Sequence, residues 1–240
     1  MKATPEAPRQ HAATRPERLL TLLLITTAVL STASATLGQL TLYYVFKPAT
    51  MLLAMALVVV RAGSVGKLER FDILLLLALL ASMAGDVFLM LPGNYFLPGL
   101  ASFLVAHLFY IALFRQNTPW FASGRALVGT LGAGAAMYAW VWGGLNDPVL
   151  KIAVATYVTV IALMVAQALG RATVGQDAAA RAVALGACAF MFSDSLIAIN
   201  RFVQPLPLVS LWVLGSYYLA QILIVRNAKP TISSLHRVAL

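Results

Sequence analysis

Long apolar runs, separated by short polar joints, cover most of the chain. A helix needs roughly 20 predominantly apolar residues to cross a bilayer, and eight runs approach that length. They lie at about 19–36, 46–61, 72–91, 96–115, 124–142, 149–169, 179–200 and 206–225. Turn-forming residues mark several joints, such as those at 92–94 and 204–207. The pattern predicts an all-α fold, a polytopic membrane bundle of eight transmembrane helices.

The composition also indicates an integral membrane protein. Of the 240 residues, 61% are hydrophobic and only 10% are charged, whereas soluble domains carry about 25% charged residues. We expect a transmembrane domain over 19–226, a disordered cytoplasmic tail at 1–18 and a second cytoplasmic tail at 227–240. In a bacterium the host membrane would be the inner cell membrane.

The net charge of +9 is best explained by membrane topology rather than by a nucleic-acid partner, because the basic residues flank the apolar runs. With the N-terminus inside, fourteen Lys and Arg residues lie on the cytoplasmic side. Only Lys47, Lys151 and Arg201 lie on the opposite side. This bias predicts cytoplasmic termini at both ends, which requires an even number of spans.

Two classes of site are excluded by simple counts. Cys188 is the single cysteine, so the chain has neither an intrachain disulfide nor a cysteine-based zinc site. Of the three histidines, only His107 lies in an apolar run. A three-histidine metal site inside the membrane is therefore excluded.

Two carboxylates, Asp86 and Asp194, lie inside apolar runs. Charge is expensive in a bilayer, so an intramembrane acid indicates a functional site by default. Each acid also has a structural interpretation, because it can hydrogen-bond to backbone or to a neighbouring helix. Both are expected near the outer ends of outward-running helices, with His107 close to mid-membrane.

Other polar side chains are expected in the same outer layer. We expect Lys47 at the start of its helix, with Pro48 at the first helical position. There Lys47 either snorkels to the interface or pairs with an aspartate or a lipid phosphate. Further candidates for contact with a substrate are Tyr110, Ser193, Asn200, Arg201, Tyr217 and Gln221.

The runs at 72–115 and 179–225 resemble each other. Asp86 precedes His107 by about as many residues as Asp194 precedes Tyr217. This spacing hints at two four-helix halves in parallel orientation.

A pair of buried acids suits acid–base chemistry. Burial favours the neutral form of an acid and a nearby cation favours its charged form. One aspartate would then act as an acid and the other, near Lys47, as a base, which suits an oxocarbenium-like transition state.

The same groups also suit a proton-coupled transporter of small molecules or lipids, or a lipid-binding protein. The absence of proline and of Gly-Gly from 72–91 and 179–200 counts against a transporter, whose helices are often broken.

Several short motifs together resemble the YhhN-like family, which is the family of the lysoplasmalogenases. The similarity covers about residues 20–226. The motifs are Lys47-Pro48, Gly85-Asp86-Val87-Phe88-Leu89-Met90, His107-Leu108-Phe109-Tyr110, Ser193-Asp194-Ser195 and Tyr217-Tyr218-Leu219-Ala220-Gln221.

The resemblance implies an eight-helix hydrolase that cleaves the vinyl ether of lysoplasmalogens, the alkenyl forms of glycerophosphoethanolamine and glycerophosphocholine. The products would be a fatty aldehyde and the glycerophospho-base. The family's proposed pair of catalytic aspartates falls on Asp86 and Asp194. The expected partners are the lysophospholipid and the bilayer.

The implied reaction requires no metal or cofactor. Protonation of the vinyl ether gives an oxocarbenium ion that water attacks; a neutral aspartate would donate the proton, and an anionic one would stabilise the cation and activate the water. His107 would orient water or tune one aspartate, and Lys47 or Arg201 would hold the phosphate. Because serines flank Asp194, we expect it to be the better solvated acid and hence the base.

Overall fold

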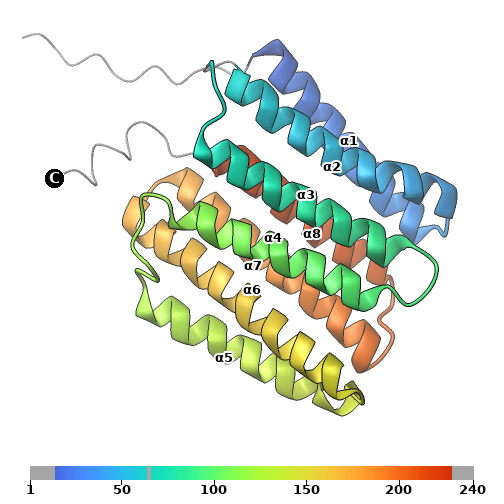
Figure 1. Cartoon of the computed structure of the whole chain (residues 1–240). Coiled ribbons are helices and arrows are strands. Elements are labelled where there is room, and N and C mark those ends of the chain that lie inside the picture. Colours follow the sequence, from blue (N-terminus) through green and yellow to red (C-terminus); the bar gives the residue numbers. More distant parts are fainter. Residues whose placement is uncertain (1–13, 64–65, 229–240) are drawn as a thin grey trace, which may run out of the picture.

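A computed structural model of the chain describes residues 14–63 and 66–228. In these ranges it contains eight α-helices, one short 3₁₀ helix and no strand (Figure 1). The elements are α1 (Arg15–Thr36), α2 (Leu40–Gly63), α3 (Arg70–Met90), α4 (Phe96–Arg115), α5 (Gly124–Val141), η1 (Trp142–Gly144), α6 (Pro148–Gly175), α7 (Ala178–Phe202) and α8 (Val209–Asn227). The all-α prediction is confirmed, and each of the eight apolar runs forms one helix.

Seven of these helices form a closed ring. In the order α1, α2, α3, α4, α6, α7, α8, each helix packs against the next, and α8 packs against α1 (Figure 1). Helix α5 lies outside the ring, against α6 and α7. Large side chains that face the ring interior are fully buried, among them Leu57, Leu79, Phe114, Phe190 and Ile224.

The first helix begins earlier than the apolar pattern indicated. α1 starts at Arg15, with Pro16 in its first turn, where a proline lacks only an N–H that would be unpaired in any case. Residues 15–18, which the sequence assigned to the N-terminal tail, are therefore helical. The rest of that tail, 1–13, and residues 229–240 of the second tail lie outside the described residues.

The expected position of Lys47 at a helix start is wrong. α2 begins at Leu40, so Pro48 lies inside the helix rather than at its first position. Proline in a membrane helix is tolerated because neighbouring groups can satisfy the carbonyl that it leaves free. Lys47 consequently lies two turns inside the helix and is only 4% exposed.

Seven helices in the described part of the chain are long and apolar enough to cross a membrane. The exception is α5, which carries Arg125 and several glycines. The seven apolar helices support a multi-pass integral membrane protein.

Two arginines tie the end of α8 to the ring. Arg61 of α2 donates to the carbonyl of Val225 at 3.1 Å, and Arg171 of α6 donates to that of Ala228 at 2.5 Å. The last carbonyls of a helix have no partner within the helix. These two side chains supply donors for them and so link α8 across the ring to α2 and α6.

At the other end of the ring, α3 and α4 approach closely at Gly85, the residue before Asp86. A Cβ atom at Gly85 would lie 2.6 Å from the ring of Phe103 on α4. That ring cannot turn away freely, because it packs edge-on against Phe190 and Tyr217. Gly85 is therefore required for the packing around Asp86.

We predict that Gly85→Ala destabilises the fold by about 1–3 kcal/mol, because overpacking a filled core displaces neighbouring side chains. The measurement is thermal unfolding of the purified protein in detergent. Gly215→Ala is the matched control, since its new methyl group would meet no atom within 4 Å. An equal loss of stability in both variants would contradict this account of the α3–α4 contact.

Candidate active site

Asp86 lies in a buried cluster formed by α2, α3 and α8. Its Oδ1 atom is 3.2 Å from Nζ of Lys47, and its Oδ2 atom accepts a hydrogen bond of 2.6 Å from the hydroxyl of Tyr217. The side chains of Lys47 and Asp86 are only 5% and 4% exposed. The ion pair is thus almost completely removed from solvent.

The remaining contacts of this cluster are also internal. Lys47 donates to the hydroxyl of Tyr43 at 3.1 Å, and the Tyr217 hydroxyl lies 3.4 Å from the sulfur of Met51. Of the roles expected for Lys47, the structure therefore shows pairing with an aspartate.

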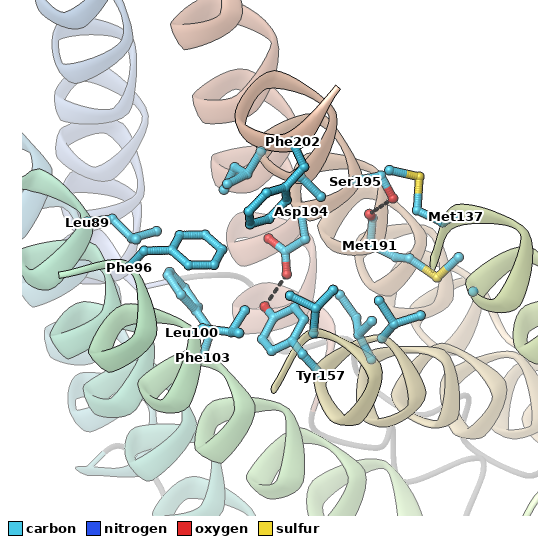
Figure 2. A pocket seen from close by; sticks show the side chains of 16 residues that line it. Leu89, Phe96, Leu100, Phe103, Met137, Tyr157, Met191, Asp194, Ser195 and Phe202 are labelled. Carbon is cyan, nitrogen blue, oxygen red and sulfur yellow. Dashed lines mark hydrogen bonds between the residues drawn. The ribbon is translucent and has the colours of Figure 1, made fainter. Parts of the chain in front are cut away.

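Asp194 lies in a second cluster, formed by α4, α6 and α7. The hydroxyl of Tyr157 donates to Oδ2 of Asp194 in a very short hydrogen bond (Figure 2). Nε2 of His107 is 3.0 Å from the Tyr157 oxygen and 3.3 Å from the same Asp194 oxygen. The Asp194 side chain is 11% exposed, whereas His107 is fully buried.

Aromatic rings lie between the two clusters. Phe190 packs edge-on against His107 of one cluster and Tyr217 of the other, with ring centroids 4.8 and 5.4 Å away. Phe103 packs against Phe190 and Tyr217. The two carboxylates thus lie in adjacent clusters that these aromatic rings separate.

Asp194 lines a cavity. This cavity lies between α4, α5, α6 and α7, with one contribution from α3. Its enclosed volume is about 60 Å³, and the value rises to about 680 Å³ when the open space at its mouth is counted. Most of its wall is apolar, and the polar side chains in the wall are Asp194, Tyr157 and Ser195 (Figure 2). Asp86 does not line it. The structure therefore offers a single carboxyl group to an apolar molecule bound there.

Arg201 lies beside this cavity, next to two of its lining residues. Its guanidinium is 4.2 Å from the ring centroid of Phe96 and 5.8 Å from that of Phe202. Its Nη2 donates to Oδ1 of Asn94 at 3.0 Å, and the side chain is exposed. The cation is thus held at the surface while touching rings that enter the cavity.

Four other sequence candidates make internal contacts and do not line the cavity. Tyr110 donates to Oε1 of Gln221 at 2.6 Å, and the Ser193 hydroxyl donates to the carbonyl of Val213. Oδ1 of Asn200 accepts from the backbone N–H of Leu206, which fixes the turn after α7.

The serines beside Asp194 do not hydrogen-bond to it. Ser195, like Ser193, donates to a backbone carbonyl, in its case that of Met191. The polar partners of Asp194 are instead Tyr157 and His107. In the described part of the chain, no three His, Cys, Asp or Glu side chains are grouped so that they could hold a metal ion.

Sequence reasoning missed Tyr157. The available signal was its position, nine residues into a helix that begins at Pro148. Membrane tyrosines are enriched at the interfaces, so a tyrosine deep in an apolar run indicates a buried hydroxyl that needs a partner.

The comparisons with known proteins agree on one family. A sequence model of the YhhN family matches residues 42–228. A lysoplasmalogenase of Mycobacterium tuberculosis is 34% identical over 197 residues, which cover 78% of this chain and 70% of the relative. Lysoplasmalogenase TMEM86B of Sus scrofa is 36% identical over 147 residues, 61% of this chain and 59% of the relative.

Human lysoplasmalogenase TMEM86A is 31% identical over 154 residues, 62% of each chain. No solved structure matches the chain. The resemblance that the motifs around Asp86, His107 and Asp194 indicated is thereby confirmed, and the chain belongs to the YhhN family.

Proposed function

We propose that this protein is an integral membrane hydrolase that cleaves the vinyl ether bond of lysoplasmalogens, with an alkenyl glycerophosphoethanolamine or glycerophosphocholine as substrate. The products are a fatty aldehyde and the glycerophospho-base. The observation that carries the proposal is a single carboxyl group, Asp194, exposed inside an apolar cavity and backed by Tyr157 and His107. The names of the curated relatives support the same reaction.

The cavity suits a lipid with one reactive polar bond. Its apolar wall accommodates an alkenyl chain, and Asp194 is positioned to meet the vinyl ether. The protonated carboxyl transfers its proton to the vinyl carbon that is not bonded to the ether oxygen. This transfer leaves an oxocarbenium ion beside the new carboxylate. Water then adds to the cationic carbon and returns a proton to Asp194. The resulting hemiacetal breaks its bond to the glycerol oxygen, which takes the hemiacetal proton, and the aldehyde is released.

In this mechanism both aspartates contribute, but in different ways. Asp194 contacts the lipid and donates the proton, which reverses the role of base that its flanking serines had suggested. Asp86 acts from the adjacent cluster, where its ion pair with Lys47 and its hydrogen bond from Tyr217 hold a fixed dipole behind the aromatic rings. The field of such a dipole is screened less in a water-poor interior than in water.

Arg201 is the proposed contact for the lipid phosphate. It is exposed beside Phe96 and Phe202, at the cavity. A guanidinium offers a phosphate two parallel hydrogen bonds. Lys47, the other cation considered for this role, is already paired with Asp86.

We further propose that all eight helices cross the membrane, with both termini in the cytoplasm. α5 packs along α6 and, with 18 residues, is long enough to traverse most of the hydrocarbon layer. The excess of basic residues on the predicted cytoplasmic side supports this orientation. The active site then lies in the outer half of the membrane.

The uninterrupted α3 and α7 favour a hydrolase over a proton-coupled transporter, whose binding helices are often broken at mid-membrane. Aldehyde release from lysoplasmalogen by the purified protein tests the choice directly. A transporter or a binding protein would leave the vinyl ether intact.

We predict that Asp194→Asn lowers kcat for aldehyde release by about 10²–10⁴-fold, since it removes the proton donor. The charge-neutral double variant Lys47→Met/Asp86→Asn removes the buried ion pair without leaving one charge alone, and we expect it to fold and to lose about 10-fold in kcat. Lys47→Met alone leaves an unpaired buried charge and is expected to cost about 3–5 kcal/mol of stability.

These variants separate the two roles. A loss in the double variant as large as that of Asp194→Asn would mean that the two aspartates share the chemistry equally. Full turnover in the double variant would restrict Asp86 to a role in folding.

A second prediction concerns the phosphate contact. Arg201→Ala is expected to raise KM about 10-fold with little change in kcat, because it removes binding that substrate and transition state share. Arg201→Lys keeps the charge but loses the planar fork, so it should recover only part of the affinity. Unchanged KM in both variants would exclude Arg201 from headgroup binding.

A third prediction concerns the topology. In a Cys188→Ala background, Gln204→Cys is expected to react with a membrane-impermeant maleimide added outside intact cells. Ala122→Cys, an exposed position in the loop before α5, is expected to react only after the cells are opened. Labelling of both cysteines from outside would contradict the proposed orientation, since an odd number of spans separates the two positions.

A further inference from the structure

The hydroxyl of Tyr157 occupies a position that packing alone does not require. Tyr157 lines the cavity, is 6% exposed, and lies on α6, the helix that packs against both α4 and α7. Its oxygen bridges His107 of α4 and Asp194 of α7. A phenylalanine would fill the same space, so the hydroxyl itself calls for an explanation.

The direction of the hydrogen bonds follows from the partners of His107. Its Nδ1 atom is buried and has no hydrogen-bond partner among the described residues, whereas Nε2 faces both Tyr157 and Asp194. Buried N–H groups without a partner are rarer than buried acceptors without one. We therefore assign the proton of the neutral ring to Nε2. His107 then donates toward Tyr157 and Asp194, and Tyr157 donates to Asp194.

Both donors converge on one carboxylate oxygen. Oδ2 of Asp194 receives the Tyr157 hydroxyl and lies 3.3 Å from Nε2 of His107. For Oδ1, no hydrogen-bond donor is found among residues 14–63 and 66–228, and the carboxyl group points into the cavity (Figure 2). The two oxygens are therefore not equivalent.

We infer that Tyr157 is a positioning residue that, together with His107, holds Oδ2 of Asp194 and leaves Oδ1 as the atom that exchanges protons with the lipid. The inference rests on the proposed function and makes it more specific. With Oδ2 occupied, a neutral Asp194 carries its proton on Oδ1, facing the vinyl ether. When that proton moves to the vinyl carbon that is not bonded to the ether oxygen, the O–H group of Tyr157 and the N–H group of His107 stabilise the carboxylate that forms. Water that adds to the cationic carbon gives its proton back to Oδ1.

The first test is Tyr157→Phe, with kcat and KM measured for aldehyde release. We expect kcat to fall about 100-fold, as for the loss of one donor to a developing negative charge, with KM nearly unchanged. The matched control is Tyr218→Phe, which removes a buried hydroxyl bonded to Ser31, away from the cavity. A general effect of losing a buried hydrogen bond would lower the stability of both variants but would not change kcat selectively in one.

A double variant tests whether Tyr157 acts through Asp194. If it does, adding Tyr157→Phe to Asp194→Asn lowers the residual activity no further, because the two residues form one unit. A further 100-fold loss in the double variant would overturn the inference. So would a Tyr157→Phe enzyme with wild-type kcat.

An assay without substrate keeps the inference separable from the proposed function. A hydrophobic carbodiimide modifies protonated carboxyl groups in apolar sites, and mass spectrometry of the full chain locates the adduct. In Tyr157→Phe, Oδ2 loses a hydrogen-bond donor, which disfavours the charged form of Asp194 relative to the protonated form. Because the reagent modifies the protonated form, we expect Asp194 to be labelled about 5-fold faster in this variant. The rate in Tyr218→Phe should match wild type.

If wild-type protein releases no aldehyde but the labelling responds as expected, the proposed function fails and the positioning role of Tyr157 stands. Equal labelling rates in wild type, Tyr157→Phe and Tyr218→Phe would overturn the positioning role itself.

Discussion

A carboxyl group in the interior of a membrane bundle needs partners, because burying an unpaired charge costs more than a small domain's entire stability. This chain meets that constraint twice, and it does so differently each time. Asp86 is paired with a cation, Lys47, and is sealed from solvent. The hydrogen-bonding partners of Asp194 are Tyr157 and His107 rather than a lysine or an arginine, and Asp194 lines a cavity. The first arrangement is a sealed ion pair, whereas the second leaves a carboxyl group accessible from the cavity.

The two clusters follow the same plan. Each aspartate is contacted from the helix before it, by Lys47 of α2 or Tyr157 of α6. Each is also contacted from a helix of the other half of the chain, Asp86 by Tyr217 of α8 and Asp194 by His107 of α4. A shift by four helices therefore relates the two sets of positions. This is the arrangement expected if the chain consists of two related four-helix halves in parallel orientation, as the spacing of the two aspartates suggested.

Much of the fold could be predicted from hydropathy, because burial in lipid imposes a length and a composition on each span. Every apolar run forms a helix, and the joints lie close to the expected positions. The exclusion of α5 from the ring could not be predicted, since the order of packing depends on how side chains interlock and not on mean hydropathy. The same is true of Lys47: Pro48 indicated a helix start, but the chain continues as helix on both sides of it.

The site could be predicted in part. A charge inside an apolar run is visible in the sequence, so Asp86, His107 and Asp194 could be singled out as candidates. The pairing of Lys47 with an aspartate is confirmed. A tyrosine inside an apolar run costs much less free energy than a charged residue does, so Tyr157 was not singled out. Which aspartate meets the cavity could not be predicted either, because both occupy similar positions along their helices. The difference arises from the rings of Phe103 and Phe190, which separate Asp86 from that space.

The position of α6 explains why we assign the proposed chemistry to Asp194. With α5 outside the ring, α6 packs directly against α4 and α7, and its Tyr157 meets His107 on one side and Asp194 on the other. Hydrolysis also needs one water molecule per turnover, and the carboxyl that can receive it is the one that is 11% exposed rather than 4%. An apolar wall keeps other water away, which strengthens the interaction between a transient cation and the carboxylate beside it. The displacement of one helix from the ring thus creates both the cavity and the donor that directs Asp194 into it.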